Sequence, residues 1–570
     1  FEADVAFRAE SAGGRANVLA HSELVTGDPR FSEAFLQKVI RLRPADVARA
    51  AARYLRPAGL TGGVFLPANG GGKRGGGGKG GGSGGGRALR QAVRRGFLPL
   101  KAAAGGGAGA PAAGVSGETG AVSGAGAVSK TGAGSGAVFS GKAEMKPARA
   151  RIRGKGDRPY TAALPGGARL VVLPGGAAPV FALRAVFLGG QRLEGGERAG
   201  LHALMSNAAV QATRGIPSRE LALRVDGLAA SLTGFAGRNS FGVSASALSR
   251  VFPEVLEIFA EVLCAPAFDP EDVALARREA EADRKSDSDD LGHLSRLRTM
   301  ALLYGTHPFA RHPLGSRRTL AGVDGRCLRR AWRRWAAPGN LVIGAAGDVD
   351  PPELARRLRR LMRGWAERAP RWRSPRPPAA PRPSGRPRAR RHAVADAAQC
   401  HIQLAYLGAT FYDPRRIALS VAAAALGSQG GGLFMELRER RGLAYAVSAS
   451  AEEALDPGPV TFYAATAPER EEEAVALMRA EIARAREEGL GREEVERAKT
   501  FLIGELVRGR QRAGGRASDL AFCARYGLRR ETPEEVKARI RAVDREAVRE
   551  AARAFLDPRR ECLVRVGPKI

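Results

Sequence analysis

The chain has 570 residues, which is too long for a single hydrophobic core, so several domains are expected. Its hydrophobic fraction of 44% is ordinary for a globular protein, and no run of about eighteen apolar residues predicts a membrane span. The net charge of +33 is spread along the chain and aromatic residues make up only 6%, which argues against a specific nucleic-acid partner.

The first segment, 1–68, repeats the last part of the chain. The sequence AGGRANVLA at 12–20 returns as AGGRASDLA at 513–521, and the offset of 501 residues needs no gap. The register holds for roughly forty-five residues, which predicts two copies of one domain type. We therefore expect 1–68 to be the C-terminal end of a preceding domain whose beginning lies before residue 1.

Two stretches of biased composition separate the domains. Residues 69–156 are rich in glycine and lysine and then in Ala/Gly/Ser/Val repeats, which predicts a disordered linker. Residues 368–396 are rich in proline and arginine, which predicts an extended, semi-stiff linker. Either could instead be a basic tether for RNA or a membrane, but a solvated linker explains the composition more simply.

Strand and helix patterns alternate in the two remaining segments, 157–367 and 397–570. In the first, apolar runs at 170–173 and 180–188 flank a Pro-Gly-Gly sequence, which predicts a hairpin. The second segment has a similar order of elements. Because strands and helices interleave without strict βαβ alternation, we expect an α+β fold with mostly antiparallel sheets flanked by helices.

Several separated segments resemble one family. They are the sequence GGGLFMELRERRGLAYAV at 430–447, the pattern V-x-x-A-A-x-x-Y/F-L-x-P at 47–57 and again at 548–558, and YGTHPF at 304–309 followed by Gly315. Taken in their order along the chain, these segments resemble the M16 peptidases, which are insulinase/pitrilysin-like and mitochondrial-processing-peptidase-like zinc metallopeptidases.

The resemblance implies repeated M16-type domains with a LuxS/metallohydrolase-like fold, arranged as two halves around a closed chamber for peptides. In active members the first domain carries an inverted zinc motif, H-x-x-E-H, whose Glu activates the zinc-bound water. The second half supplies an Arg and a Tyr that hold the substrate or the developing oxyanion. We expect 157–367 to be an M16-type domain without the zinc motif and 397–570 to be the C-terminal domain.

The zinc motif is absent where the resemblance places it. Ala203, Ser206 and Asn207 stand at the positions of its His, Glu and His, and His202 is one place out of register. An alanine cannot bind a metal, and a serine is a poor general base. No cofactor is therefore expected in this chain, and zinc is expected in a missing N-terminal half or in a partner subunit.

The other histidines do not restore a metal site. His307 and His312 are five residues apart with prolines between and after them, so helical i,i+4 pairing is not available. His392 and His401 are nine residues apart across the end of a predicted linker. We predict no metal at either pair.

Arg438 and Tyr445 are the candidate substrate-binding residues. They are seven residues apart, and a turn at Gly442 between a helix and a strand would bring both side chains to one end of a sheet. A guanidinium and a phenol can both donate to a peptide carbonyl. From the spacing alone, Arg438 could equally be one cation in an arginine-rich run and Tyr445 a core residue; the family resemblance favours the functional interpretation.

Three hypotheses follow. The first is the C-terminal half of a zinc metalloendopeptidase, which encloses a peptide or protein substrate without binding zinc itself. The second is a non-catalytic partner or structural subunit that pairs with a separate zinc-bearing M16-type chain. The third, a basic nucleic-acid- or membrane-binding protein, belongs to another class and is not favoured by the spread of charge. Whether this chain acts in an active enzyme stays open at this point.

Overall fold

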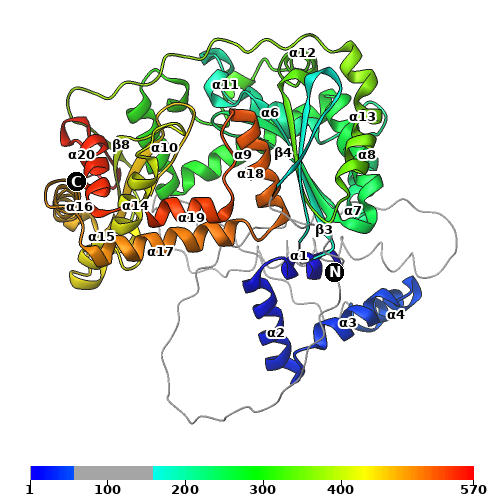
Figure 1. Cartoon of the computed structure of the whole chain (residues 1–570), viewed down its shortest axis with the longest axis horizontal. Coiled ribbons are helices and arrows are strands. Elements are labelled where there is room, and N and C mark those ends of the chain that lie inside the picture. Colours follow the sequence, from blue (N-terminus) through cyan, green and yellow to red (C-terminus); the bar gives the residue numbers. More distant parts are fainter. Residues whose placement is uncertain (1, 57–157, 177, 570) are drawn as a thin grey trace, which may run out of the picture. The chain divides into compact units, whose positions relative to one another are not determined.

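The computed structural model describes residues 2–56, 158–176 and 178–569 (Figure 1). The predicted glycine-rich linker, 69–156, lies outside the described residues. The boundaries at residues 68/69 and 156/157 therefore stay predictions. From residue 158 onward, the described residues form two mixed sheets with helices.

Contacts divide the chain into two compact units, Phe1–Ser32 with Ala148–Ile570, and Glu33–Pro147. The start of the chain is helical. Its helix α4 belongs to the second unit, and α1 and α2 belong to the first. The four N-terminal helices are α1 (Glu2–Ala9), α2 (Ala12–Thr26), α3 (Phe31–Ile40) and α4 (Pro44–Tyr54).

The internal repeat is also a repeat of local structure. Helices α2, α3 and α4 correspond to three helices near the C-terminus when their bounds are shifted by 501 residues, and every bound agrees within one residue. Two copies of one sequence pattern thus form the same helices in the same order. The three C-terminal helices are α18 (Ala513–Tyr526), α19 (Pro533–Arg541) and α20 (Arg545–Phe555).

The glycines of the AGGRA sequence have a steric role in both copies. A Cβ on Gly14 would lie closer than 3.0 Å to the carbonyl oxygen of Arg8, and a Cβ on Gly515 would lie as close to that of Gly509. Arg8 and Gly509 are themselves 501 residues apart. A glycine is needed at each position because the chain turns sharply from one helix into the next. The turn brings the glycine Cα close to a carbonyl oxygen at the end of the preceding helix.

The arginines of the same sequence form a hydrogen bond across each of these two helix–helix turns, which we call the AGGRA corners. Arg15 Nη1 donates to the carbonyl oxygen of Ala9 at 2.7 Å, and Arg516 Nη1 donates to that of Arg510 at 3.3 Å. In both cases the acceptor lies six residues before the arginine, at the end of the preceding helix. The arginine thereby satisfies a helix-terminal carbonyl that has no intrahelical partner.

The first sheet has the order β1-β2-β6-β3-β5-β4. The pair β2 and β6 is parallel, and the other neighbouring pairs are antiparallel. The predicted α+β class with mostly antiparallel sheets is confirmed. The strands are β1 (Tyr160–Ala163), β2 (Arg169–Pro174), β3 (Val180–Leu188), β4 (Ser231–Ala236), β5 (Ser240–Leu248) and β6 (Leu341–Gly347).

The hairpin predicted from 170–173 and 180–188 is wrong. Strand β6 lies between β2 and β3, although more than 150 residues separate it from β3 along the chain. All seven residues of β6 are buried, so a central place in the sheet covers both of its faces. The Pro-Gly-Gly sequence therefore connects two strands that are not neighbours.

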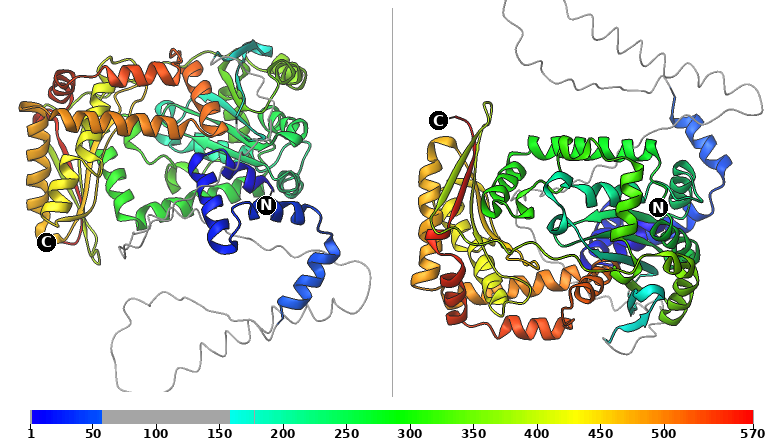
Figure 2. Two further views of the ribbon diagram at one scale, coloured as in Figure 1. Left: turned by 60° about the horizontal axis from the view of Figure 1, so that its bottom comes forward. Right: turned by 90° about the horizontal axis from the view of Figure 1, so that it is seen from above.

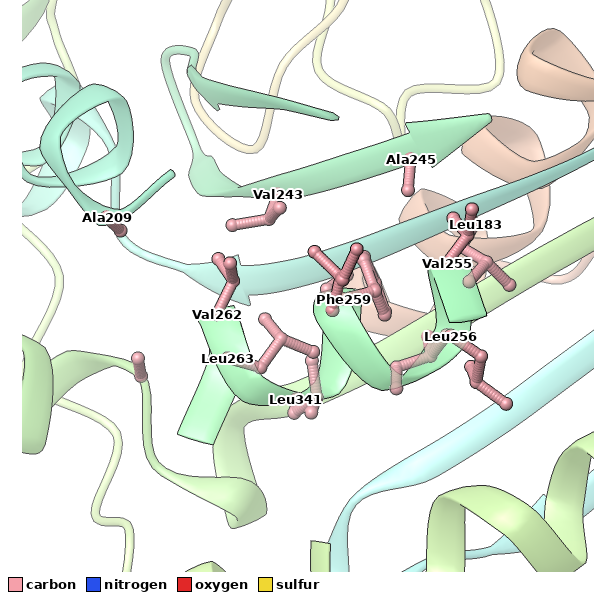
Figure 3. Packing of buried hydrophobic residues seen from close by; sticks show 14 of the residues in the cluster. Leu183, Ala209, Val243, Ala245, Val255, Leu256, Phe259, Val262, Leu263 and Leu341 are labelled. Carbon is pink, nitrogen blue, oxygen red and sulfur yellow. The ribbon is translucent and has the colours of Figure 1, made fainter. Parts of the chain in front are cut away.

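One face of the first sheet is covered by helices, with α8 (Phe252–Cys264) at the centre of the core. Its apolar residues recur at spacings of three and four, which gives one buried stripe. Figure 3 shows Leu256, Phe259 and Leu263 of this helix packed beside Leu183, Val243 and Leu341 of the sheet. The remaining helices of this part are α6 (Leu201–Ala209), α7 (Ser218–Gly227), α9 (Pro270–Asp289), α10 (Leu291–Tyr304), α11 (Arg317–Leu320), α12 (Gly325–Trp335) and α13 (Pro351–Arg368).

The second sheet has the order β7-β11-β8-β10-β9, and β7 and β11 are its parallel pair. Strand β7 lies inside the stretch 368–396 that the sequence predicts as a linker, so the sheet begins earlier than expected. Its strands are β7 (Arg388–Ala393), β8 (Cys400–Leu407), β9 (Ala444–Ala451), β10 (Pro459–Thr466) and β11 (Cys562–Gly567); its further helices are α14 (Arg416–Gly427), α15 (Gly432–Phe434), α16 (Glu471–Glu487) and α17 (Arg492–Gly509).

Each sheet receives one helix from the other domain. Helix α18, from the C-terminal segment, packs on β6, β3 and β2 of the first sheet, and α10, from the first segment, packs on β11 and β8 of the second. Leu520 of α18 meets Val171 and Val342, and Met300 of α10 meets Ala405. Figure 1 shows α18 beside β3 and β4, and Figure 2 shows the two sheets from other sides.

One helical stretch of the described residues, Arg416–Arg440, is long and apolar enough to span a membrane by length and composition. Its apolar window is 61% buried inside the protein. Core helices of globular proteins pass the same test, and α14 within this stretch packs against β9, α17 and α20. The burial identifies it as a core helix.

Candidate functional site

The positions of the altered zinc motif lie on α6. Ala203 and Ser206 are buried, and Asn207 is partly buried. The helix sits directly on β4, because a Cβ on Gly234 would lie closer than 3.0 Å to the carbonyl oxygen of Ser206. Ala203 has no donor atom, and the buried Ser206 Oγ has no hydrogen-bond partner. These residues do not fit a zinc ion, so no chemical step is assigned to a metal in this chain.

His202, beside that motif, is a core residue. Its side chain is 1% exposed, and its Nδ1 lies 3.1 Å from the carbonyl oxygen of Gly190 and 3.2 Å from a carboxylate oxygen of Glu194. The ring stacks on Phe241 and meets the edge of Trp335, each at a centroid distance of 4.8 Å. All of these contacts lie inside the protein, so His202 has a structural role at the start of α6 and is not positioned to bind a ligand.

The histidines of the YGTHPF region have their Nδ1 atoms occupied. His307 Nδ1 accepts the backbone N–H of Phe309 at 3.2 Å, and His312 Nδ1 accepts that of Leu314 at 3.1 Å. The lone pair of each Nδ1 is therefore engaged by a backbone N–H and is not available to a metal ion. In the described parts of the chain, no group of three or more His, Cys, Asp or Glu side chains is placed to hold a metal ion.

His392 and His401 lie on different strands of the second sheet. His392 of β7 and His401 of β8 both stand opposite Val566 of β11, which lies between them. Two strand spacings therefore separate their backbones, about 9–10 Å. His401 Nδ1 is also within 2.9 Å of the Tyr463 hydroxyl.

Arg438 and Tyr445 lie together at the start of β9. Arg438 belongs to a π-helical turn, Met435–Arg440, and Gly442 with a φ of +57° then turns the chain into the strand. Arg438 Nη1 donates to the carbonyl oxygen of Tyr445 at 3.1 Å. Its guanidinium also lies 5.3 Å from the centre of the Tyr445 ring and 5.1 Å from that of Phe434.

Both side chains keep donors that face solvent. The Tyr445 residue is 77% exposed and the Arg438 side chain is 43% exposed. Arg438 Nε approaches Glu439 at only 4.0 Å, and its other N–H groups have no acceptor among the described residues. The exposure of Tyr445 excludes the interpretation of this tyrosine as a core residue. The pair can offer a planar cation and a phenol to a peptide carbonyl.

A cleft of about 730 Å³ lies where the two domains meet. The turn between β4 and β5, helix α10, the end of β9 and helix α18 surround it. Arg184 of β3 is part of its lining, together with Phe235 and Phe522. The sequence analysis did not select Arg184, although a charged residue in the apolar run 180–188 is a signal that could have found it.

An ion-pair cluster joins the two domains near this cleft. Arg192 donates to both carboxylate oxygens of Asp456, at 2.6 and 2.8 Å, and His307 Nε2 lies 3.2 Å from the same carboxylate. Burial alone would raise the pKa of Asp456, but the hydrogen bonds from Arg192 and His307 outweigh it and lower the pKa to about 2. The two domains are thus held in one arrangement by polar contacts as well as by the exchanged helices.

Comparison with known families agrees with this architecture. Residues 177–313 match the family described as insulinase (peptidase family M16), and residues 327–502 match the peptidase M16 inactive domain. The two matches follow each other in the order in which the two sheets are built. The first sheet thus falls mainly within the insulinase match, and the second sheet begins within the match to the M16 inactive domain.

Curated relatives align with more than two thirds of this chain. An uncharacterized zinc protease of Mycobacterium tuberculosis is 30% identical over 423 residues, which are 72% of this chain and 93% of the relative. One of Streptomyces coelicolor is 26% identical over 409 residues, which are 71% and 88% of the two chains. The chain therefore belongs to the M16 peptidase family.

Solved structures share the fold. A peptidase M16 inactive domain from Pseudomonas fluorescens superposes with a TM-score of 0.65 at 25% identity and covers 72% of this chain and 98% of that one. A protease from Helicobacter pylori has a TM-score of 0.64 at 15% identity, with 72% and 99% covered. The second likeness concerns the fold alone.

Proposed function

We propose that this chain is the zinc-free half of an M16-type zinc metalloendopeptidase and encloses the peptide substrate of a zinc-bearing half. In this role the Arg438 guanidinium and the Tyr445 hydroxyl donate hydrogen bonds to the substrate carbonyl or to the oxyanion that develops from it. The zinc-bearing half is either encoded upstream in the same gene or supplied by a separate chain.

The observation that carries the proposal is the combination of two sites. Helix α6 offers no metal ligand at Ala203, Ser206 and Asn207, while Arg438 and Tyr445 keep exposed donors side by side. A half that has lost the metal but kept these donors can bind and orient a peptide without cleaving it. Membership of a peptidase family agrees with a peptide ligand.

The N-terminal helices support an upstream half in the same chain. We propose that 1–68 belongs to a preceding M16-type domain, of which α2, α3 and α4 are the described helices. They share their order, their bounds and the AGGRA corner with α18, α19 and α20. Residues 57–68 lie outside the described part of the chain.

The test is a peptidase assay on the full-length gene product with an internally quenched peptide, with and without a chelator. We expect chelator-sensitive cleavage that Arg438→Ala lowers about 100-fold in kcat/KM, because oxyanion donors contribute effects of this order. Tyr445→Phe should lower it less, because it removes one donor and keeps the ring. Arg440→Ala is the matched control, since Arg440 is an exposed arginine in the same turn and is paired with Glu436.

The other outcomes separate the alternatives. Activity that appears only when a separate zinc-bearing chain is added would favour a non-catalytic partner subunit. Full-length protein that binds but never cleaves peptides, even with such a chain, would favour a structural subunit. Wild-type activity in Arg438→Ala and Tyr445→Phe would remove the clamp role from this pair.

A further inference from the structure

The cleft between the two domains has a cation at its base. Arg184 projects from β3 on the face of the first sheet that α18 covers, and its guanidinium lies 3.4 Å from the centre of the Phe235 ring. Phe522 of α18 is the second ring near it, at 5.5 Å. Because water is excluded on these sides, burial lowers the pKa of Arg184 to about 10.

Among the described residues, Arg184 makes no ion pair and no hydrogen bond; its Nε is buried without a partner, and its guanidinium contacts only aromatic rings. Two other half-buried arginines show how this chain satisfies such a group elsewhere. Arg525 donates to the carbonyl oxygen of Asn340 at 3.1 Å, and Arg516 donates to backbone carbonyls, including that of Gln511 at 2.7 Å. Arg184 is a guanidinium left with its donors open.

The carboxylates that line the cleft are already neutralised. Glu452 is shared by Arg238 and Arg296, so two cations stand against one anion. Glu453 is paired with Arg416 at 2.9 Å, and Asp519 is paired with Arg510 at 3.1 Å. The lining therefore has an excess of positive charge, to which Arg184 contributes a full unit.

Polar and aromatic groups complete the cleft. Asn239 is 7% exposed, lines the cleft and has a side-chain oxygen without a hydrogen-bond partner. The hydroxyl of Tyr526 donates to Ser240 Oγ at 2.8 Å beside it. Tyr526 also stacks on Phe522 and on Phe411, which makes one wall of the cleft aromatic.

We propose that this cleft is a binding site for an acidic peptide segment, in which Arg184 receives a side-chain carboxylate of the ligand. A planar guanidinium with open N–H groups matches a carboxylate in two parallel hydrogen bonds. The aromatic wall can cover the apolar side chains of the same peptide. The volume lies within the range of about 300–1,000 Å³ that is usual for ligand pockets.

This site is separate from the Arg438–Tyr445 pair and involves no cleavage. It can therefore exist whether or not the chain serves a zinc-bearing half. The two proposals are measured by different readouts: peptide binding by the chain itself in one case and cleavage by the full-length product in the other.

The experiment is a fluorescence-anisotropy titration of the 570-residue chain with two fluorescein-labelled hexapeptides that carry either two glutamates or two glutamines and are otherwise identical. We expect the glutamate peptide to bind about tenfold more tightly than the glutamine peptide at low salt, with the difference shrinking as salt screens the charges. Arg184→Gln should remove that preference. Arg184→Lys, which keeps the charge but not the fork, should retain part of it.

Arg224→Gln is the control, because Arg224 is an exposed arginine on α7 paired with Glu220. Circular dichroism checks that each variant is folded. A saturating amount of the glutamate peptide should raise the Tm of the wild-type chain and of Arg224→Gln but not that of Arg184→Gln. Equal affinity for the two peptides, no measurable binding, or an unchanged preference in Arg184→Gln would each overturn the proposal.

Discussion

The carboxylate of Glu10 accepts the backbone N–H of Ala513 at 2.7 Å, although the two residues are 503 positions apart. The contact has a counterpart in the opposite direction, because Gln511 Oε1 accepts the backbone N–H of Ala12 at 3.1 Å. Glu10 corresponds to Gln511, and Ala12 to Ala513, in the internal repeat. The two copies thus cap each other's helices across a local two-fold relationship.

This exchange predicts that Glu10 stabilises the docking of the N-terminal segment. Glu10→Ala leaves the N–H of Ala513 without its acceptor at the start of α18, and helix caps of this kind contribute about 1 kcal/mol. Thermal unfolding should show a lower Tm for Glu10→Ala. Glu23→Ala, at an exposed position of α2, is the control and should change stability by less than about 0.5 kcal/mol. Equal Tm values for the two variants would mean that the cap contributes nothing.

The cluster at Asp456 predicts a loss of stability in acid. The pKa of Asp456 falls from an ordinary 3.8 to about 2 on folding, so its contribution is complete above about pH 5 and is lost as pH falls through 2. Asp456→Asn leaves the partly exposed Arg192 without its partner and should cost about 1–3 kcal/mol at neutral pH. Denaturant unfolding between about pH 7 and pH 2 measures both effects, because the variant should also lose stability less steeply in acid than the wild type.

Glu488→Gln is the control for this pH series, since Glu488 is an exposed residue at the end of α16. Its free energy of unfolding should follow that of the wild type across the range. A pH profile of Asp456→Asn parallel to the wild-type profile would show that another group governs the acid limb.

The contact between α18 and the first sheet predicts that Gly344 cannot be enlarged. A Cβ at Gly344 of β6 would lie closer than 3.0 Å to the carbonyl oxygen of Ala517 on α18. Gly344→Ala should therefore push the helix from the sheet and destabilise the protein by about 1–3 kcal/mol. Gly514→Ala, at a helical position with nothing within 4 Å, should be neutral or slightly stabilising. Chemical denaturation of both variants tests this, and a harmless Gly344→Ala would mean that α18 packs more loosely.

The composition of α6 predicts that zinc does not stabilise this chain. A zinc site would raise the free energy of unfolding by about 2.7 kcal/mol at a zinc concentration 100 times its Kd. Because Ala203, Ser206 and Asn207 supply no suitable ligand set, the Tm should stay constant on addition of zinc, with magnesium as the control ion. A rise in Tm that a chelator reverses would point to a metal site elsewhere in the chain.

The turn at Gly442 and the internal repeat could be predicted from the sequence, but the neighbours of each strand and helix could not. The turn at Gly442 brought Arg438 and Tyr445 together as expected, because seven residues and one left-handed glycine determine that geometry. The hairpin between β2 and β3 failed because β6, far along the chain, takes the central place. Hydrophobic periodicity reports which residues are buried but not which strand is their neighbour.

The cleft was missed for a related reason. Arg184 belongs to the first domain, but Phe522 and Tyr526 come from a helix of the last one, and no spacing in the sequence joins them. The pattern of β3 predicts a buried apolar strand, and Arg184 is its one charged residue. A single arginine inside an apolar strand conflicts with the surrounding hydrophobic pattern, and such conflicts are expected at functional sites.

The exchange of α10 and α18 also constrains how the protein is made. During synthesis the first sheet is complete once β6 has emerged, but one of its faces stays uncovered until α18 follows, about 170 residues later. At a typical elongation rate of about 5–20 residues per second, that apolar face is exposed for roughly ten to thirty seconds. Folding of the first domain on the ribosome must therefore wait for the second, and this interval is when the nascent chain most needs a chaperone.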